Sequence, residues 1–229
     1  MDLVLKRRAE KAYLILAAIF LSSLVASNLI FQKFFHWSPF GIYTFELSVG
    51  ILPYPITFVV TDLVSEIYGR KRANQMVLIG FIASVFTLLI ITVADAVPAT
   101  PWSPINDQTF SQVFGLTFVA VGASMAAYLI AQLVDVQLFH FWKKLTRGKH
   151  LWLRNNASTF VSQLVDTMVI LLILCSFEVI AWERFTDLLM HGFLFKVLVA
   201  MADTPVVYFV VWLFRNQFKL KGPNEVLDF

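Results

Sequence analysis

Charged side chains are scarce in this sequence: only 14% of its 229 residues are Asp, Glu, Lys or Arg, whereas 59% are hydrophobic. A soluble domain carries about 25% charged residues, so this chain lacks the side chains that would cover a water-exposed surface. It contains 23 Phe, and its mean hydropathy is +0.74. Lipid is therefore the expected solvent for most of its side chains.

Cysteine and the common catalytic motifs are also missing. The single cysteine, Cys175, lies within an apolar run, which excludes an internal disulfide framework and a cysteine-based metal cluster. The chain has no H-E-x-x-H, G-x-S-x-G or G-x-x-x-x-G-K-[ST] motif. Its four histidines are scattered without metal-ligand spacing. We therefore expect no cofactor, and no nucleotide hydrolysis by this chain alone.

The chain does have long apolar runs, and the length of each is close to the ~20 residues that a helix needs to cross a bilayer. The six runs cover approximately residues 12–32, 45–67, 76–96, 113–139, 157–180 and 188–214. The first is too long for the apolar core of a signal peptide, usually about 7–15 residues, so we interpret it as a retained helix. The sequence predicts an all-α, polytopic membrane protein with six transmembrane helices, forming a single domain over residues 1–229.

The basic residues fall mostly on one side of this six-span arrangement. Segments 6–11, 70–72, 143–154 and 215–221 hold fifteen of the 18 Lys and Arg residues. Because short cytoplasmic segments of membrane proteins are enriched in Lys and Arg, both termini are expected in the cytoplasm. Nucleic-acid binding is not expected, since no basic helix or stacking platform accompanies these segments.

Ionisable residues also lie within or near the spans, where a charge at the bilayer centre costs about 2.5–3.5 kcal/mol. They are Asp62, Glu66, Asp135, Asp166, Lys196 and Asp203. Such groups are tolerated where they face a polar interior and have partners there. Lys196 and Asp203 are seven residues apart, roughly 10 Å along a helix. We therefore expect Lys196 to pair with Asp62 or Asp166 from another span.

Two of these carboxylates also have an interfacial interpretation. Glu66 lies four residues before Arg70, which favours an ion pair between them at the membrane surface. Asp135 is expected near the inner interface, where a structural role and a functional one are equally open.

Prolines interrupt two of the spans. Pro53 and Pro55 fall inside the second span, and Pro205 falls inside the sixth. A proline within a helix frees a backbone carbonyl, and broken helices in transporters often line the binding site. Kinking for packing alone is the alternative.

Six spans divide into halves of three, and with an odd number per half any repeat is inverted. Residues 24–37 align with 129–142 at an offset of 105, and Asp62 and Asp166 are separated by 104. This weak similarity predicts a 3+3 inverted repeat with a substrate site near its midplane.

Five stretches carry a family resemblance. They are TDLVSEIYGRKRA (61–73), SNLIFQ (27–32), AQLVDVQLF (131–139), ASTFVSQLVDT (157–167) and FKVL (195–198). Together they resemble the queuosine precursor transporter family, formerly grouped as putative vitamin uptake transporters, over nearly the whole chain. The resemblance implies a multi-pass importer in the bacterial inner membrane, which brings in 7-deazaguanine bases for tRNA modification.

A deazaguanine substrate would suit the polar groups of the spans. Its N–H and amino groups fit a carboxylate, its O6 needs a donor, and its ring packs on aromatic faces. The candidate substrate-binding residues are Asn28, Tyr54, Phe58, Asp62, Gln132, Asp135, Gln163, Asp166 and Lys196. In this interpretation Asp62 or Asp166 binds the amidine edge, and Lys196 balances the remaining charge.

Three other functions stay open. The chain is alternatively a substrate-capture subunit of an ATP-driven importer, which would dock an ATPase through the small residues Ala123, Ala127 and Ala131. An intramembrane enzyme would need a nucleophile–base or metal-ligand set, and none is found. A structural or assembly protein is the fourth interpretation. The sequence leaves open the oligomeric state, the energy coupling and the base carried, whether the cyano base, the aminomethyl base or queuine.

Overall fold

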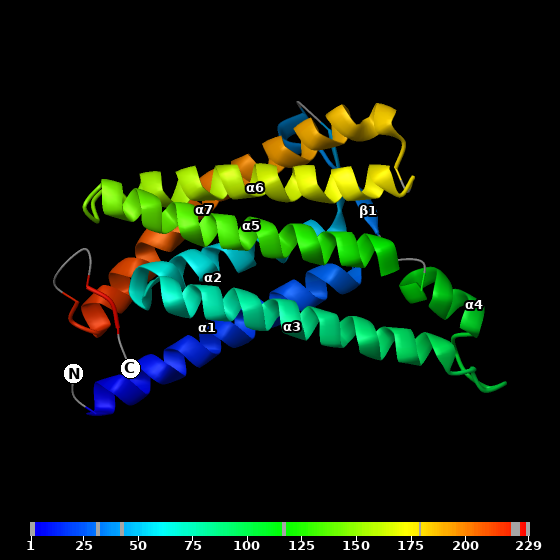
Figure 1. Cartoon of the computed structure of the whole chain (residues 1–229), viewed down its shortest axis with the longest axis horizontal. Coiled ribbons are helices and arrows are strands. Elements are labelled where there is room, and N and C mark those ends of the chain that lie inside the picture. Colours follow the sequence, from blue (N-terminus) through cyan, green and yellow to red (C-terminus); the bar gives the residue numbers. More distant parts are fainter. Residues whose placement is uncertain are drawn as a thin grey trace.

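Helices make up nearly all of the computed structural model, which describes residues 3–30, 33–41, 44–115, 118–178, 180–220 and 225–227 (Figure 1). The long helices are α1 (Leu3–Ile30), α2 (Tyr54–Ile67), α3 (Gly69–Ala96), α5 (Phe118–Leu145), α6 (Leu151–Ser176) and α7 (Phe185–Gln217). With the short turns that lead into α2 and α7, six helical segments are long and apolar enough to cross a membrane. The predicted all-α architecture with six spans is confirmed.

Smaller elements lie at the end of the bundle opposite the start of α1 (Figure 1). An antiparallel hairpin joins β1 (Phe34–Trp37) to β2 (Phe45–Ser48), with Phe35 opposite Leu47. The short helix α4 (Asp107–Phe110) precedes α5, and 3₁₀ turns occupy Pro39–Gly41, Val49–Ile51 and Trp182–Arg184. A π-helical turn spans Ser111–Gly115. The hairpin differs from the prediction, in which residues 45–48 belong to the second span.

The prolines have two different roles. Pro53 is the residue that precedes α2, and Pro55 lies in its first turn. A proline is favourable there, since the first N–H groups of a helix have no partner within it. The expectation that Pro53 and Pro55 break a helix is therefore wrong, because they begin one. Pro205 does lie inside α7, as predicted.

Helix α2 is the centre of the bundle. Its residues from Thr57 to Ile67 are buried, apart from a half-buried Val59, whereas α1, α3 and α7 expose large apolar side chains such as Leu14, Phe86 and Phe209. The outer helices thus present apolar faces suited to lipid. The polar residues of α2 face protein, as is required of charged groups at membrane depth.

Close packing holds α1 against α3. Gly80 of α3 lies under Phe20 and Leu24 of α1, and a Cβ at Gly80 would come within 2.6 Å of Phe20 Cε1.

The alanine row of α5, formed by Ala123, Ala127 and Ala131, is buried inside the chain. These alanines serve internal packing, so the interpretation of this row as a docking face for another subunit is wrong.

The basic segments meet at one end of the bundle, where α1 begins and α7 ends (Figure 1). The Tyr13 hydroxyl of α1 donates a hydrogen bond to the carbonyl of Arg72 in α3 (3.3 Å), and the Leu227 N–H bonds the carbonyl of Ile67 at the end of α2 (2.7 Å). Many of these basic residues lie within helix ends rather than loops, because the helices extend beyond the expected spans. Which side of the membrane this end faces stays a prediction from the positive residues.

The inverted repeat also stays a prediction. Residues 24–30 and 129–135 are both helical, but the aligned segments then differ, because Phe34–Trp37 forms β1 while its counterpart continues α5.

Candidate functional site

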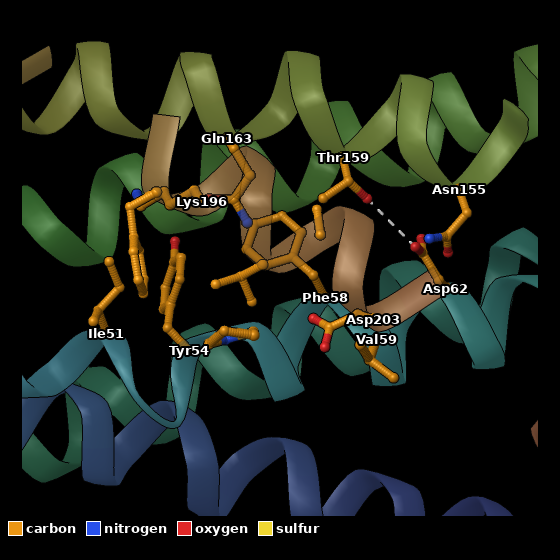
Figure 2. Close-up of a pocket in the computed structure, with 14 residues that line it drawn as sticks. Ile51, Tyr54, Phe58, Val59, Asp62, Asn155, Thr159, Gln163, Lys196 and Asp203 are labelled. Carbon is orange, nitrogen blue, oxygen red and sulfur yellow. Dashed lines mark hydrogen bonds between the residues drawn. The ribbon is translucent and has the colours of Figure 1, made fainter. Parts of the chain in front are cut away.

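A pocket lies within the bundle between α2, α6 and α7 (Figure 2). Helix α2 contributes Tyr54, Phe58 and Asp62, which are four residues apart and so share one helical face. Glu66, the next residue at this spacing, does not line this pocket. Figure 2 shows that the α6 side chains of the pocket point toward those of α2.

The remaining polar lining comes from the second half of the chain. Helix α6 contributes Asn155, Thr159 and Gln163, again at four-residue spacing, and α7 contributes Lys196 and Asp203. The polar groups therefore converge from three helices on one interior space, which is the arrangement typical of a binding site in a helical membrane protein.

The pocket is small. Its cavity of about 20 Å³ has room for a single water molecule. At the hairpin end, Phe195 lines the pocket and packs its ring against Trp37 and Phe45, with centroid distances of 5.3 Å and 5.8 Å. We call Trp37, Phe45 and Phe195 the aromatic cap. A ligand larger than water enters only if this cap or the opposite end of the pocket opens.

Lys196 is held by a carboxylate from another helix, as the sequence predicted. Its ammonium group lies 2.5 Å from Asp166 Oδ2 and 3.1 Å from Thr167 Oγ1. It also lies 5.1 Å from the centroid of the Tyr54 ring, within the range of a cation–π interaction. Of the two partners expected for Lys196, Asp166 is the one observed, which leaves the Asp62 carboxylate without this cation.

Three acceptor oxygens of the pocket residues have no hydrogen-bond partner within the part of the chain that the structure describes. They are Asp62 Oδ1, Asn155 Oδ1 and Gln163 Oε1, on side chains that are buried. Such oxygens cost free energy when left unbonded. A ligand that brings several N–H donors would satisfy them.

Opposite the aromatic cap, one carboxylate joins four helices. Glu66 of α2 lies 3.1 Å from Lys143 of α5, 3.0 Å from Arg154 of α6 and 2.7 Å from Arg215 of α7. We call these four residues the Glu66 cluster. Next to it lies an open cavity of about 750 Å³, lined in part by Glu66, Arg154 and Arg215.

The interfacial pair expected between Glu66 and Arg70 is wrong. Glu66 is 1% exposed and its carboxylate is occupied by three cations that are distant in sequence, whereas Arg70 is exposed. Local helical spacing favoured Arg70, but α2 ends at Ile67 and α3 begins at Gly69, which has a φ of +81°. The change of direction at this glycine separates the two side chains.

The other predicted site residues lie outside the pocket lining. Asp135 is fully buried within the protein beside Asp62, and its depth in the membrane stays a prediction. Gln132 links α5 to α2: it accepts a hydrogen bond from Thr61 (3.1 Å) and donates one to Thr57 (3.4 Å). Asn28 accepts from Ser124 at 3.5 Å and borders a separate small cavity.

Sequence reasoning missed Asn155 and Thr159 as lining residues, and it noted Asp203 as an intramembrane charge without placing it in the site. The spacing of Asn155, Thr159 and Gln163 was a usable signal, since positions i, i+4 and i+8 share one helical face. The apolar lining residue Phe195 carried no such signal, because one phenylalanine among 23 does not stand out.

Comparison with known proteins gives consistent matches. Residues 48–210 match the model of a family described as putative vitamin uptake transporter. The chain is 32% identical over 124 residues to the "probable queuosine precursor transporter" of Bacillus subtilis, an alignment that covers 53% of each chain. It is 23% identical over 203 residues to the "queuosine precursor transporter" of Escherichia coli, covering 88% of this chain and 86% of that one.

A third relative, from Haemophilus influenzae, is also named "probable queuosine precursor transporter", with 26% identity over 127 residues. That alignment covers 56% of this chain and 51% of the relative, so the match spans about half the length of the Bacillus and Haemophilus proteins. No solved structure gives a significant match.

Proposed function

Because this chain belongs to the family described as putative vitamin uptake transporters, we propose that it imports queuosine precursors across the bacterial inner membrane for tRNA modification. Its relatives are named as transporters, and its six apolar helices make it a multi-pass membrane protein. These findings support a transporter rather than an enzyme. The identity of the cargo, a 7-deazaguanine base, is our proposal.

The observation that supports this cargo is the set of unpartnered acceptors in the pocket. A 7-deazaguanine presents a ring N–H and an amino group on one edge, and a carboxylate accepts both as it does from base edges elsewhere. Asp62 is the carboxylate suited to this edge, because Asp166 is already paired with Lys196. Asn155 and Gln163 offer further acceptors for N–H groups of the ring.

Aromatic side chains would hold the plane of the base. Tyr54 and Phe58 lie on the pocket face of α2, with ring centroids 5.4 Å apart. Flat heterocycles bind well against such rings. The Lys196 ammonium, beside Tyr54, supplies the donor that the O6 atom of the base requires.

Transport would proceed by opening the two ends of the pocket in turn. The aromatic cap closes the hairpin end with apolar contacts, and the Glu66 cluster closes the other end with ion pairs. In alternating access one end opens while the other stays closed. In this scheme the structure is the state between the two openings, and its small cavity, with room for about one water molecule, supports that assignment.

The test is the queuosine content of tRNA in a bacterial host that lacks both precursor synthesis and its own importer. The cyano base, the aminomethyl base and queuine are each supplied at nanomolar concentration to cells that express the protein. We expect at least one base to restore queuosine, and Asp62→Asn to abolish the restoration at equal membrane expression. Asp187→Asn is the matched control, because Asp187 is exposed in the first turn of α7.

Two results would contradict the proposal. If no base restores queuosine in cells with confirmed membrane expression, the cargo is wrong. If Asp62→Asn supports the same uptake as Asp187→Asn, the base does not bind as described.

A further inference from the structure

Two carboxyl groups meet in the interior of the bundle beside the pocket. Asp62 of α2 and Asp135 of α5 are 2% and 0% exposed, and they lie within hydrogen-bonding reach of each other. Thr159 donates to Asp62 Oδ2 at 3.4 Å, and Ser162 donates to Asp135 Oδ1 at 2.8 Å. The other oxygen of each carboxyl group has no partner among the described residues.

No cation is paired with either carboxyl group in the described part of the chain. Helix α6 brings Arg154 into electrostatic range of Asp62, but Arg154 is bound to Glu66. Helix α7 brings Lys196, which is bound to Asp166, together with Asp203, the other carboxyl group that lines the pocket besides Asp62.

The other ionisable groups nearby do not supply positive charge either. Helix α5 itself contributes Tyr128, which lies within electrostatic range of Asp166 and Asp135. Helix α2 contributes Glu66, one turn beyond Asp62, whose charge is neutralised by its own cluster. The neighbours of the pair on α6 are the hydroxyl groups of Ser158, Thr159 and Ser162.

Two carboxylates in contact, away from water and without a cation, cannot both stay ionised. A single proton resolves the conflict, because one carboxyl group then donates to the other. Hydroxyl groups of Ser158 and Ser162 donate to Asp135 and favour its ionised form, so the proton lies on Asp62 in the empty site. It moves to Asp135 when the N–H donors of a base bind Asp62, because only the ionised form of Asp62 accepts them.

We propose that Asp62 and Asp135 hold one shared proton that is carried inward with each base, so that the transporter is a proton–base symporter. The inference rests on the proposed import function. With a base bound, the proton resides on Asp135, whose O–H donates to the Asp62 carboxylate. The base and the proton therefore occupy the site together.

Release of the proton follows from the position of Arg154. The Nε atom of its guanidinium lacks a hydrogen-bond partner among the described residues, although Nη2 of the same group donates to Glu66. When the Glu66 cluster opens, Arg154 becomes free to neutralise the two aspartates. The O–H bond of Asp135 then breaks, the proton passes to water on that side, and both carboxylates pair with the guanidinium while the empty carrier returns.

The transport test uses purified protein in vesicles with radiolabelled 7-cyano-7-deazaguanine, 7-aminomethyl-7-deazaguanine or queuine. An outside-acidic gradient should drive accumulation of about tenfold per pH unit for one proton per base, and a protonophore should abolish it. The accumulation ratio of the Asp135→Asn variant should fall to one at every pH gradient. Asp95→Asn is the matched control, because Asp95 accepts a hydrogen bond from Ser111 (2.6 Å) and does not line the pocket.

The outcomes separate the two proposals. If base exchange occurs but accumulation ignores the pH gradient, or follows a sodium gradient instead, the proton site is wrong and the import function stands. If no base is exchanged, the import function fails.

The shared proton is tested independently of any substrate by infrared spectroscopy at neutral pH. A protonated-carboxyl band should be present in the wild type and in Asp95→Asn, and absent from both Asp62→Asn and Asp135→Asn. Each substitution is isosteric and retains a hydrogen-bonding group. A band that persists in both aspartate variants, or is missing from the wild type, overturns the proposal.

Discussion

Replacing Glu66 by Gln should destabilise the protein more than any other removal of a single charge. The substitution keeps the shape of the side chain but leaves Lys143, Arg154 and Arg215 without their carboxylate. Arg154 is 2% exposed and cannot turn to water. Breaking a buried ion pair by removing one partner costs about 3–5 kcal/mol, a large part of the 5–15 kcal/mol that stabilises a typical domain. For a chain of this size each kcal/mol lowers the midpoint of thermal unfolding by about 2–4 °C, so we expect a loss on the order of 10 °C.

The assay is thermal unfolding of the purified protein in detergent, with the monodisperse fraction as a second readout. Glu183→Gln is the matched control, because Glu183 is exposed in the turn before α7. Adding Arg154→Gln to the Glu66 variant should recover part of the loss, since one uncompensated cation is removed. A midpoint for Glu66→Gln within 2 °C of the Glu183 control would refute the argument that this carboxylate holds four helices together.

Two further predictions concern packing and the second ion pair. Gly80→Ala should lower the free energy of unfolding by about 1–3 kcal/mol, because the added Cβ meets the Phe20 ring at 2.6 Å. Gly122→Ala is the control and should leave the unfolding midpoint unchanged, because a Cβ there meets nothing within 4 Å. Equal midpoints for the two variants would contradict the close packing of α1 on α3. Asp166→Asn should lose about 3–5 kcal/mol by leaving the Lys196 ammonium unpaired, and adding Lys196→Met should restore the unfolding midpoint but not base uptake. Restored uptake in that double variant would show that the pair has no part in binding.

The long helices were predictable because the signal is carried by composition over some 20 residues. The hairpin was not, because its strands Phe34–Trp37 and Phe45–Ser48 are short and apolar and continue the hydrophobic pattern of the neighbouring spans. The role of Pro53 and Pro55 depended on where α2 begins. A shift of a few residues turns a proline from a helix breaker into a residue of the first turn.

The site was predictable only in part, for a physical reason. The sequence identified Asp62, Asp166 and Lys196 because an ionisable residue in an apolar run is conspicuous, and it limited the partner of Lys196 to two carboxylates. It failed for Glu66, because its true partners lie 77, 88 and 149 residues away. Helical spacing reveals neighbours within one helix, and contacts between helices depend on a packing that spacing does not encode.

The Glu66 cluster also has a consequence for biosynthesis. Helix α2 is made early and carries two buried carboxyl groups, each of which costs about 2.5–3.5 kcal/mol at the bilayer centre when it has no partner. The cations for Glu66 come from α5, α6 and α7, and the last of them, Arg215, lies near the end of α7. In a nascent chain Glu66 therefore has no partner until α5 is made, and its set of partners is complete only when the final helix has been synthesised. Newly made protein should depend on the insertion machinery for that interval, and a chain cut short before α7 should be a target for membrane proteases.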